Sequence, residues 1–185
     1  MTPTMAKITD LYANKGGRPL IAVDFSPPRS GDPAFAEAAR TLDADLVCVA
    51  SACPDDIDPE AIGAARITYL EGYLFDKEPA KQAFVKAAEL AHAAGRKVAL
   101  SLSDPFCVDR HRRAFRHLVS GHVDVLFANE VEIVSLFEAG SFDDAVGAIR
   151  GHCEIAALTR GADGSVIVTA DEMIDIAAGA NALAQ

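Results

Sequence analysis

Short apolar runs alternate along the chain with amphipathic stretches. The runs at residues 19–25, 44–50, 67–70, 97–102, 123–128 and 155–159 predict buried strands. The clearest helix is expected at residues 79–95, where Phe84, Ala87 and Leu90 share one face and Gly95 provides a stop. This alternation predicts βαβ units and an α/β fold with a mostly parallel, doubly wound sheet. Five or six parallel strands are too few to close the alternative, an eight-stranded barrel.

The last third of the chain adds shorter elements. Helices are expected at residues 108–119, 131–138 and 142–150. A strand at 164–169 is expected to run antiparallel to strand 155–159, and a short strand is expected within 171–176.

The strand at residues 123–128 stops at Asn129 and leads directly into a helix that carries Glu132. Ligands of parallel α/β sheets bind beyond the carboxyl ends of the strands, which makes both residues candidates for a site. The same Asn-x-x-Glu spacing is that of a capping box, in which Asn caps the helix and Glu reaches back to its N–H. Both interpretations remain open at this point.

Two further strand ends carry candidate chemistry. After strand 155–159, the glycines of Thr159-Arg160-Gly161-Ala162-Asp163-Gly164 would let the backbone approach a phosphate or base, although a tight turn needs them equally. Asp104-Pro105 ends another strand, where a simple turn is the alternative. The helix that follows is rich in arginine, and its histidines His111 and His117 fall on different faces. We therefore expect a solvated basic helix there and no metal site.

Charge narrows the choice of ligand. The net charge of −10 argues against nucleic acid and anionic membranes as partners, but a helix N-terminus can still bind a phosphate.

The four cysteines form no C-x-x-C pair, and residues 1–10 lack an apolar signal-peptide core. No apolar run reaches the length of a membrane span, so a cytoplasmic protein is expected. Nucleophile-elbow, G-x-G-x-x-G and P-loop motifs are absent from the sequence.

Several segments together resemble a known family. In order, they are PDDIDPEAI, ITYLEGYLFD, AHAAGRKVALSLSDPFCVDRHR, LFANEVEI and LTRGADGSVIV, all between residues 53 and 177. With this order and spacing, the chain resembles the PfkB (ribokinase-like) carbohydrate and nucleoside kinases, most of all their adenosine-kinase-like branch. The resemblance implies a ribokinase-like sheet and an ATP-dependent phosphotransferase that acts on a nucleoside or sugar.

The resemblance also implies roles for particular residues. Asn129 would help to hold the phosphates, and Glu132 would help to hold magnesium. The ATP site would be bordered by Thr159, Gly161 and Gly164, and the cleft would be faced by Asp104 and Phe106. ATP and magnesium are the implied cofactors, and the implied partner is a small-molecule nucleotide.

The end of the chain departs from this family. Its late Gly-Ala-Gly-Asp motif, which supplies the general base, corresponds here to Gly179-Ala180-Asn181-Ala182. The catalytic base is therefore unidentified, and the C-terminal helices that complete the family's nucleotide pocket are missing. We expect an impaired or inactive kinase, or else a non-catalytic nucleotide-binding or structural α/β domain.

The front of the chain has a different resemblance. Residues 1–50 are similar to the start of methylenetetrahydrofolate reductases, on the strength of Val23-Asp24-Phe25-Ser26-Pro27-Pro28-Arg29. A reductase-like protein is thus a further alternative, although the later flavin-binding strands are missing. We expect a single α/β domain over 1–185, in which a βαβ segment of different origin (1–52) joins a ribokinase-like segment (53–177) and a tail (178–185). Such a chimera could self-associate through an unpaired sheet edge.

Overall fold

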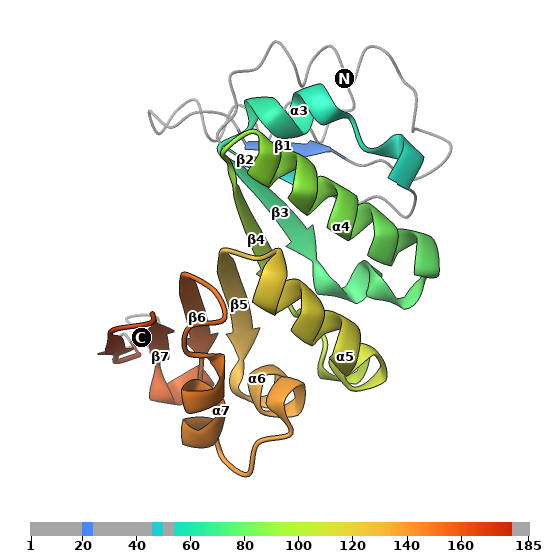
Figure 1. The fold of residues 1–185 in the computed structure, drawn as a ribbon. Helices are drawn as coiled ribbons and strands as arrows, with labels where there is room; N and C mark the ends of the chain where they lie inside the picture. The colour runs from blue at the N-terminus through green and yellow to red at the C-terminus, as the bar shows by residue number, and fades with distance from the viewer. Residues whose placement is uncertain (1–19, 24–45, 50–53, 179–185) are drawn as a thin grey trace, which may run out of the picture. The chain divides into compact units, whose positions relative to one another are not determined.

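A computed structural model of the chain describes residues 20–23, 46–49 and 54–178 (Figure 1). The reductase-like motif beyond Val23 and the segment Gly179–Ala182 lie outside the described residues. The chain divides into two compact units, Met1–Ala99 and Leu100–Gln185. The predicted boundaries near residues 52 and 177 are untested and stay predictions.

Among its described residues, the first unit contains parallel strands and two main helices. Strands β1 (Leu20–Val23), β2 (Leu46–Val49) and β3 (Ile67–Glu71) pair in parallel in that order. Strand β4 (Lys97–Ser101) lies next to β3 and crosses the boundary between the units. Between these strands lie η1 (Pro54–Asp56), α3 (Pro59–Ala64), η2 (Gly72–Asp76) and α4 (Glu78–Ala93).

Helix α4 provides much of the first unit's core. Its small side chains allow close packing, and Phe84 contacts Phe75 with ring centroids 5.4 Å apart. Gly95, at φ 68°, ends the helix in the left-handed conformation expected of a glycine stop. The buried residues of this helix are Ala80, Ala83, Phe84, Ala87, Ala88 and Ala91.

The second unit has a mixed sheet. Strand β5 (Val125–Asn129) pairs in parallel with β6 (Ile155–Thr159). Strands β7 (Ser165–Val168) and β8 (Met173–Ile176) follow, and each is antiparallel to the strand before it. The helices are α5 (Pro105–Gly121), α6 (Glu130–Phe137), α7 (Phe142–Ile149) and the short η3 (Gly161–Asp163).

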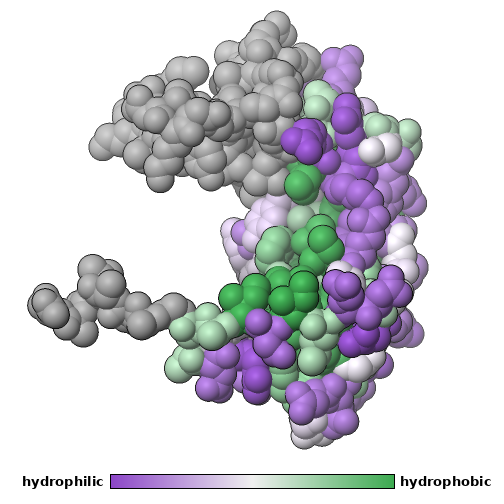
Figure 2. Space-filling model, turned by 90° about the vertical axis from the view of Figure 1, so that its left-hand side faces the viewer, coloured by the Kyte–Doolittle hydropathy of each residue, from purple (hydrophilic) through white to green (hydrophobic). Residues whose placement is uncertain are grey.

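The two faces of this sheet differ in burial. Leu126 and Leu158 are fully buried on one face, and α6 contacts both of their strands. On the other face, Phe127 and Ile155 are exposed, because side chains alternate along a strand. Figure 2 shows apolar residues gathered on the side of the second unit toward which β7 lies in Figure 1. The buried face of the second unit's sheet therefore packs against the helices, and the opposite face exposes apolar side chains.

The predicted α/β fold with a mostly parallel, incomplete sheet is confirmed. Within each unit the described strands pair in chain order, so the reversal of a doubly wound sheet does not occur among them. Helix α5 begins three residues earlier than expected, because Asp104 caps it and Pro105 takes its first position. Among the described residues, no helix combines the length and the apolar character that crossing a membrane requires.

Candidate functional site

The end of β5 and the start of α6 form a complete capping box. The Oδ1 of Asn129 accepts a hydrogen bond from the Glu132 N–H at 2.9 Å. In return, Glu132 Oε2 accepts from the Asn129 N–H at 2.9 Å, and Oε1 accepts from Asn129 Nδ2 at 2.8 Å. Asn129 is both the last residue of the strand and the helix cap, so no loop separates them. The capping interpretation is correct, and it fixes both side chains at the carboxyl end of β5.

Glu132 is a buried carboxyl group, with only 5% of its surface exposed. Burial raises the pKa of this carboxyl above its ordinary value, and nearby Asp104 raises it further by charge repulsion. The hydrogen bond from the Asn129 N–H acts in the opposite direction and lowers the pKa. A buried carboxylate beside a second acidic group favours a neutralising partner, which can be a proton or a cation.

Asp104 occupies the cap of a second helix. Its Oδ1 accepts from the Phe106 N–H at 3.0 Å, and its Oδ2 accepts from the Cys107 N–H at 3.2 Å. Just before it, the Leu102 N–H donates to the Phe127 carbonyl of β5 at 3.0 Å. This bond joins the segment that precedes α5 to the strand that carries Asn129. Phe106, in contrast, is 71% exposed, so the structure does not bury its ring beside these carboxylates.

The turn after β6 lies next to the capping box. Thr159 is paired in register with Asn129 across the two parallel strands. The turn is closed by the Arg160 N–H, which donates to the Gly164 carbonyl at 2.8 Å. Gly161 and Gly164 both have positive φ, 56° and 90°. Asp104, Asn129, Glu132 and Thr159 thus gather at one edge of the second unit's sheet, as their positions at strand ends predicted.

Arg160 is a neighbour of this site that the sequence did not single out. Its guanidinium lies over the Phe142 ring at 4.3 Å, and its Nε is 3.7 Å from Glu130 Oε2. That Nε is buried and lacks a hydrogen-bond acceptor among the described residues. The arginine follows Thr159 directly, and Glu130 is the first residue of α6. A positive charge is therefore held beside the helix end that carries Asn129.

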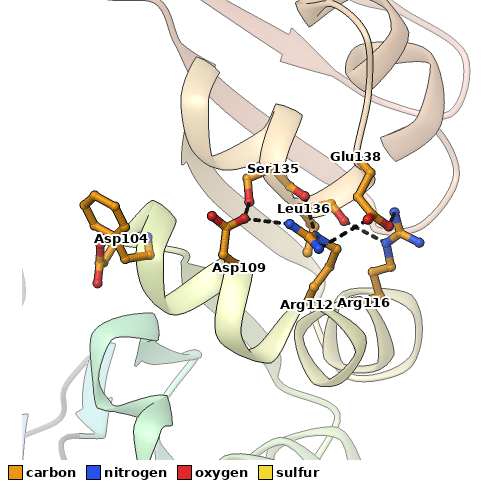
Figure 3. Close-up of polar contacts among 8 residues, drawn as sticks. Asp104, Asp109, Arg112, Arg116, Ser135, Leu136 and Glu138 are labelled. Carbon is orange, nitrogen blue, oxygen red and sulfur yellow. Dashed lines mark hydrogen bonds and ion pairs between the residues drawn. The ribbon is translucent and has the colours of Figure 1, made fainter.

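The expectation of a solvated basic helix is wrong for two arginines of α5. Arg112 donates to the Ser135 carbonyl at 2.7 Å, and Arg116 donates to the Leu136 carbonyl at 2.7 Å (Figure 3). Sequence periodicity could not identify these acceptors, which lie 23 and 20 residues further along the chain. The helix is also kinked at His111, where φ and ψ are −123° and 20°.

The carboxylates of Glu132 and Asp104 have the ligand type and the number that a magnesium site requires. Magnesium prefers oxygen ligands, and it is usually held by one or two carboxylates together with phosphate oxygens and water. Glu132 and Asp104 supply two carboxylates that repel each other, and a divalent cation would relieve this repulsion. All four of their oxygens already accept N–H bonds, so contact through ordered water fits better than a cage made only of protein ligands.

Replacing Glu132 with glutamine is expected to change how stability depends on pH. A raised folded-state pKa means that the native protein retains its proton at pH values where the unfolded chain has lost it. The stability contributed by Glu132 is therefore full below about pH 4.5 and is lost as pH rises through the raised pKa. Urea unfolding with a chelator present measures this effect. The difference in the free energy of unfolding between the unchanged protein and Glu132→Gln should become smaller as the pH rises from acidic to neutral. A difference that grows with pH would contradict this assignment.

Comparison with known proteins adds a family to this geometry. A family model described as pfkB family carbohydrate kinase matches residues 45–181. Two solved structures share 40% identity with the chain over 69% of its length, each with a TM-score of 0.66. They are a probable sugar kinase from Rhizobium etli CFN 42 and the adenosine kinase from Sinorhizobium meliloti. No match was found among curated protein sequences.

A third structure is similar in fold alone. It is a putative ribokinase II from E. coli in complex with ATP and magnesium, with 15% identity, a TM-score of 0.62 and coverage of 69% of this chain. The chain covers 39% of each of the first two structures and 42% of this one. The resemblance of residues 1–50 to a reductase is not tested by these comparisons and stays a prediction.

Proposed function

Because the chain belongs to the pfkB family of carbohydrate kinases, we propose that the second unit is the nucleotide side of a phosphotransferase site. The observation that carries this proposal is the complete capping box of Asn129 and Glu132 beside Thr159. ATP would bind at this sheet edge, with its phosphates at the N-terminus of α6. There the positive end of the helix dipole favours an anion.

Each residue has a definite task in this proposal. Thr159, Gly161 and Gly164 border the nucleotide, and Asn129 orients the phosphates. Glu132 holds magnesium through water, and Asp104 adds a second negative charge to the same ion. When bound, magnesium supplies charge neutralisation for the transferred phosphoryl group. Phe106 remains available to contact the nucleotide because its ring is exposed.

The activity itself is proposed to be impaired. Ala182 stands where the family resemblance places the general base, so the chain has no carboxylate there to accept the substrate's proton. The second candidate function is therefore a nucleotide-binding domain without catalysis, and the base position favours it. A nucleoside or sugar remains the proposed acceptor class.

Calorimetric titration with magnesium-ATP tests the proposed site. The unchanged protein is expected to bind, and Asn129→Ala is expected to weaken binding by about tenfold or more, since it removes a phosphate-orienting amide and exposes Glu132 to rearrangement. Ser141→Ala is the matched control, because Ser141 caps the eight-residue helix α7 in the same way.

Both substitutions remove one helix cap, worth about 1 kcal/mol of stability. Binding that weakens equally in the two variants would indicate general destabilisation and would contradict the proposed site. Absence of any heat with the unchanged, folded protein would leave a purely structural α/β domain. Binding that persists when magnesium is replaced by a chelator would contradict the role of Glu132.

A further inference from the structure

Helix α6 is short, and its C-terminal end is held by another helix. It has eight residues, only about two turns, and helices of this length are marginal without tertiary contacts. Arg112 Nε donates to the Ser135 carbonyl and Arg116 Nε donates to the Leu136 carbonyl, both at 2.7 Å (Figure 3). These carbonyls belong to the last turn, where a cation is also favoured by the helix dipole.

The same two arginines make further charged contacts. Arg112 reaches Asp109 at 2.6 Å and Glu138 at 3.3 Å, and Asp109 also accepts from Ser135 Oγ at 2.5 Å. Arg116 lies 3.7 Å from Glu138. We call Asp109, Arg112, Arg116 and Glu138 the α5 clamp.

The α5 clamp differs from an ordinary surface ion pair. The side chains of Arg112 and Arg116 are only 27% and 40% exposed, and each donates to a backbone carbonyl and also forms an ion pair with a carboxylate. Isolated exposed pairs contribute little to stability, whereas an arginine engaged at several points fixes the geometry of its partner. The clamp therefore sets where the last turn of α6 lies.

The position of the last turn also affects the first. Asn129 ends β5 and caps α6, so no flexible loop lies between the strand and the helix. The helix is held at its first turn by the capping box and at its last turn by the α5 clamp. Release of the last turn would let α6 tilt about Asn129 and would move Glu132 relative to Asp104 and Thr159.

We propose that Arg112 and Arg116 are positioning residues for the nucleotide site, acting through α6 without touching the ligand. This rests on the proposed function of Asn129 and Glu132. Their task is to hold the helix so that the capping box and the adjacent turn face the phosphates in one arrangement. A merely local role would stabilise the last turn of α6 and leave the first turn unchanged.

The test uses the full chain with Arg112→Gln and Arg116→Gln, which remove the charge, and the matching lysine variants, which retain it. Arg113→Lys and Arg113→Gln are the controls, because Arg113 lies on the same helix and is exposed. Amide hydrogen exchange is measured at Asn129 and Glu132, and at Ala145 of α7 for comparison. Magnesium-ATP affinity is measured in parallel.

The glutamine variants are expected to speed exchange at Asn129 and Glu132 several-fold, with Ala145 unchanged. They should also lower magnesium-ATP affinity by about tenfold, with partial rescue by lysine. Faster exchange confined to Glu138 and Ala139, with the first turn unaffected, would overturn the proposal. If the unchanged chain binds no magnesium-ATP, the proposed function fails, but exchange at the first turn still decides whether the clamp positions α6. Should a glutamine variant not fold, the lysine variant is compared with Arg113→Lys by the same two measurements.

Discussion

Replacing Gly164 with alanine is expected to lower the free energy of unfolding by about 2–5 kcal/mol. Gly164 has φ 90° and ψ −136°, a conformation that is nearly exclusive to glycine. An added Cβ would overlap the carbonyl oxygen of Ile176 and would lie 2.8 Å from the backbone nitrogen of Ala178. Because both obstacles are backbone atoms, no side-chain rotation can remove them. Urea unfolding followed by circular dichroism measures the loss.

Gly161→Ala is the control within the same turn. Gly161 also has positive φ, 56°, but an added Cβ would have no other atom within 4 Å. Only the backbone strain remains there, worth about 1–2 kcal/mol. Equal losses in the two variants would show that strain alone matters. That result would contradict the close contact between the turn and the segment at Ile176.

Restoring the proposed base is expected to have the largest effect on activity. The double variant Asn181→Gly with Ala182→Asp should phosphorylate adenosine or ribose about 10²–10⁴ times faster than the unchanged chain. The reason is that a carboxylate at this position could accept the proton of the attacking hydroxyl. The measurement is transfer of labelled phosphate from ATP, with the products separated from unreacted nucleotide.

The control is Asn181→Gly with Ala182→Asn, which has the same shape as the restored base but cannot accept the proton. It should remain at the rate of the unchanged chain. A rate as high as that of the aspartate variant would mean that Ala182 does not mark the position of the base. Comparable rates in the unchanged chain and the aspartate variant would contradict the proposed impairment.

Much of the fold followed from local signals in the sequence. The alternation of apolar and polar positions identified β5 and β6, because each of these strands buries one face, on which Leu126 and Leu158 lie. The capping box was readable because Asn129 and Glu132 are only three residues apart and satisfy each other. The antiparallel pairing of β7 with β6 was readable as well, because a short glycine turn joins them.

Long-range contacts were less accessible. In the sequence, Arg112 and Arg116 belong to an arginine-rich helix that is typical of an exposed basic surface. Only the folded chain shows that carbonyl groups of α6 accept hydrogen bonds from them. The raised pKa of Glu132 depends on burial and on Asp104, which is distant in sequence. Helix α5 begins at Pro105, three residues before the predicted start, although Asp104-Pro105 has the sequence pattern of an N-cap followed by proline at the first helical position.

The capping box has a consequence for how this chain can evolve. Asn129 and Glu132 close a helix as well as occupy the proposed site, so selection for folding alone retains them. A lineage that abandons catalysis would keep these two residues and Gly164, while exposed residues without a structural task, such as Phe106, drift first. Substitutions at positions 106 and 182 would therefore indicate how long ago such a lineage lost its activity, whereas Asn129 would be retained and would give no such information.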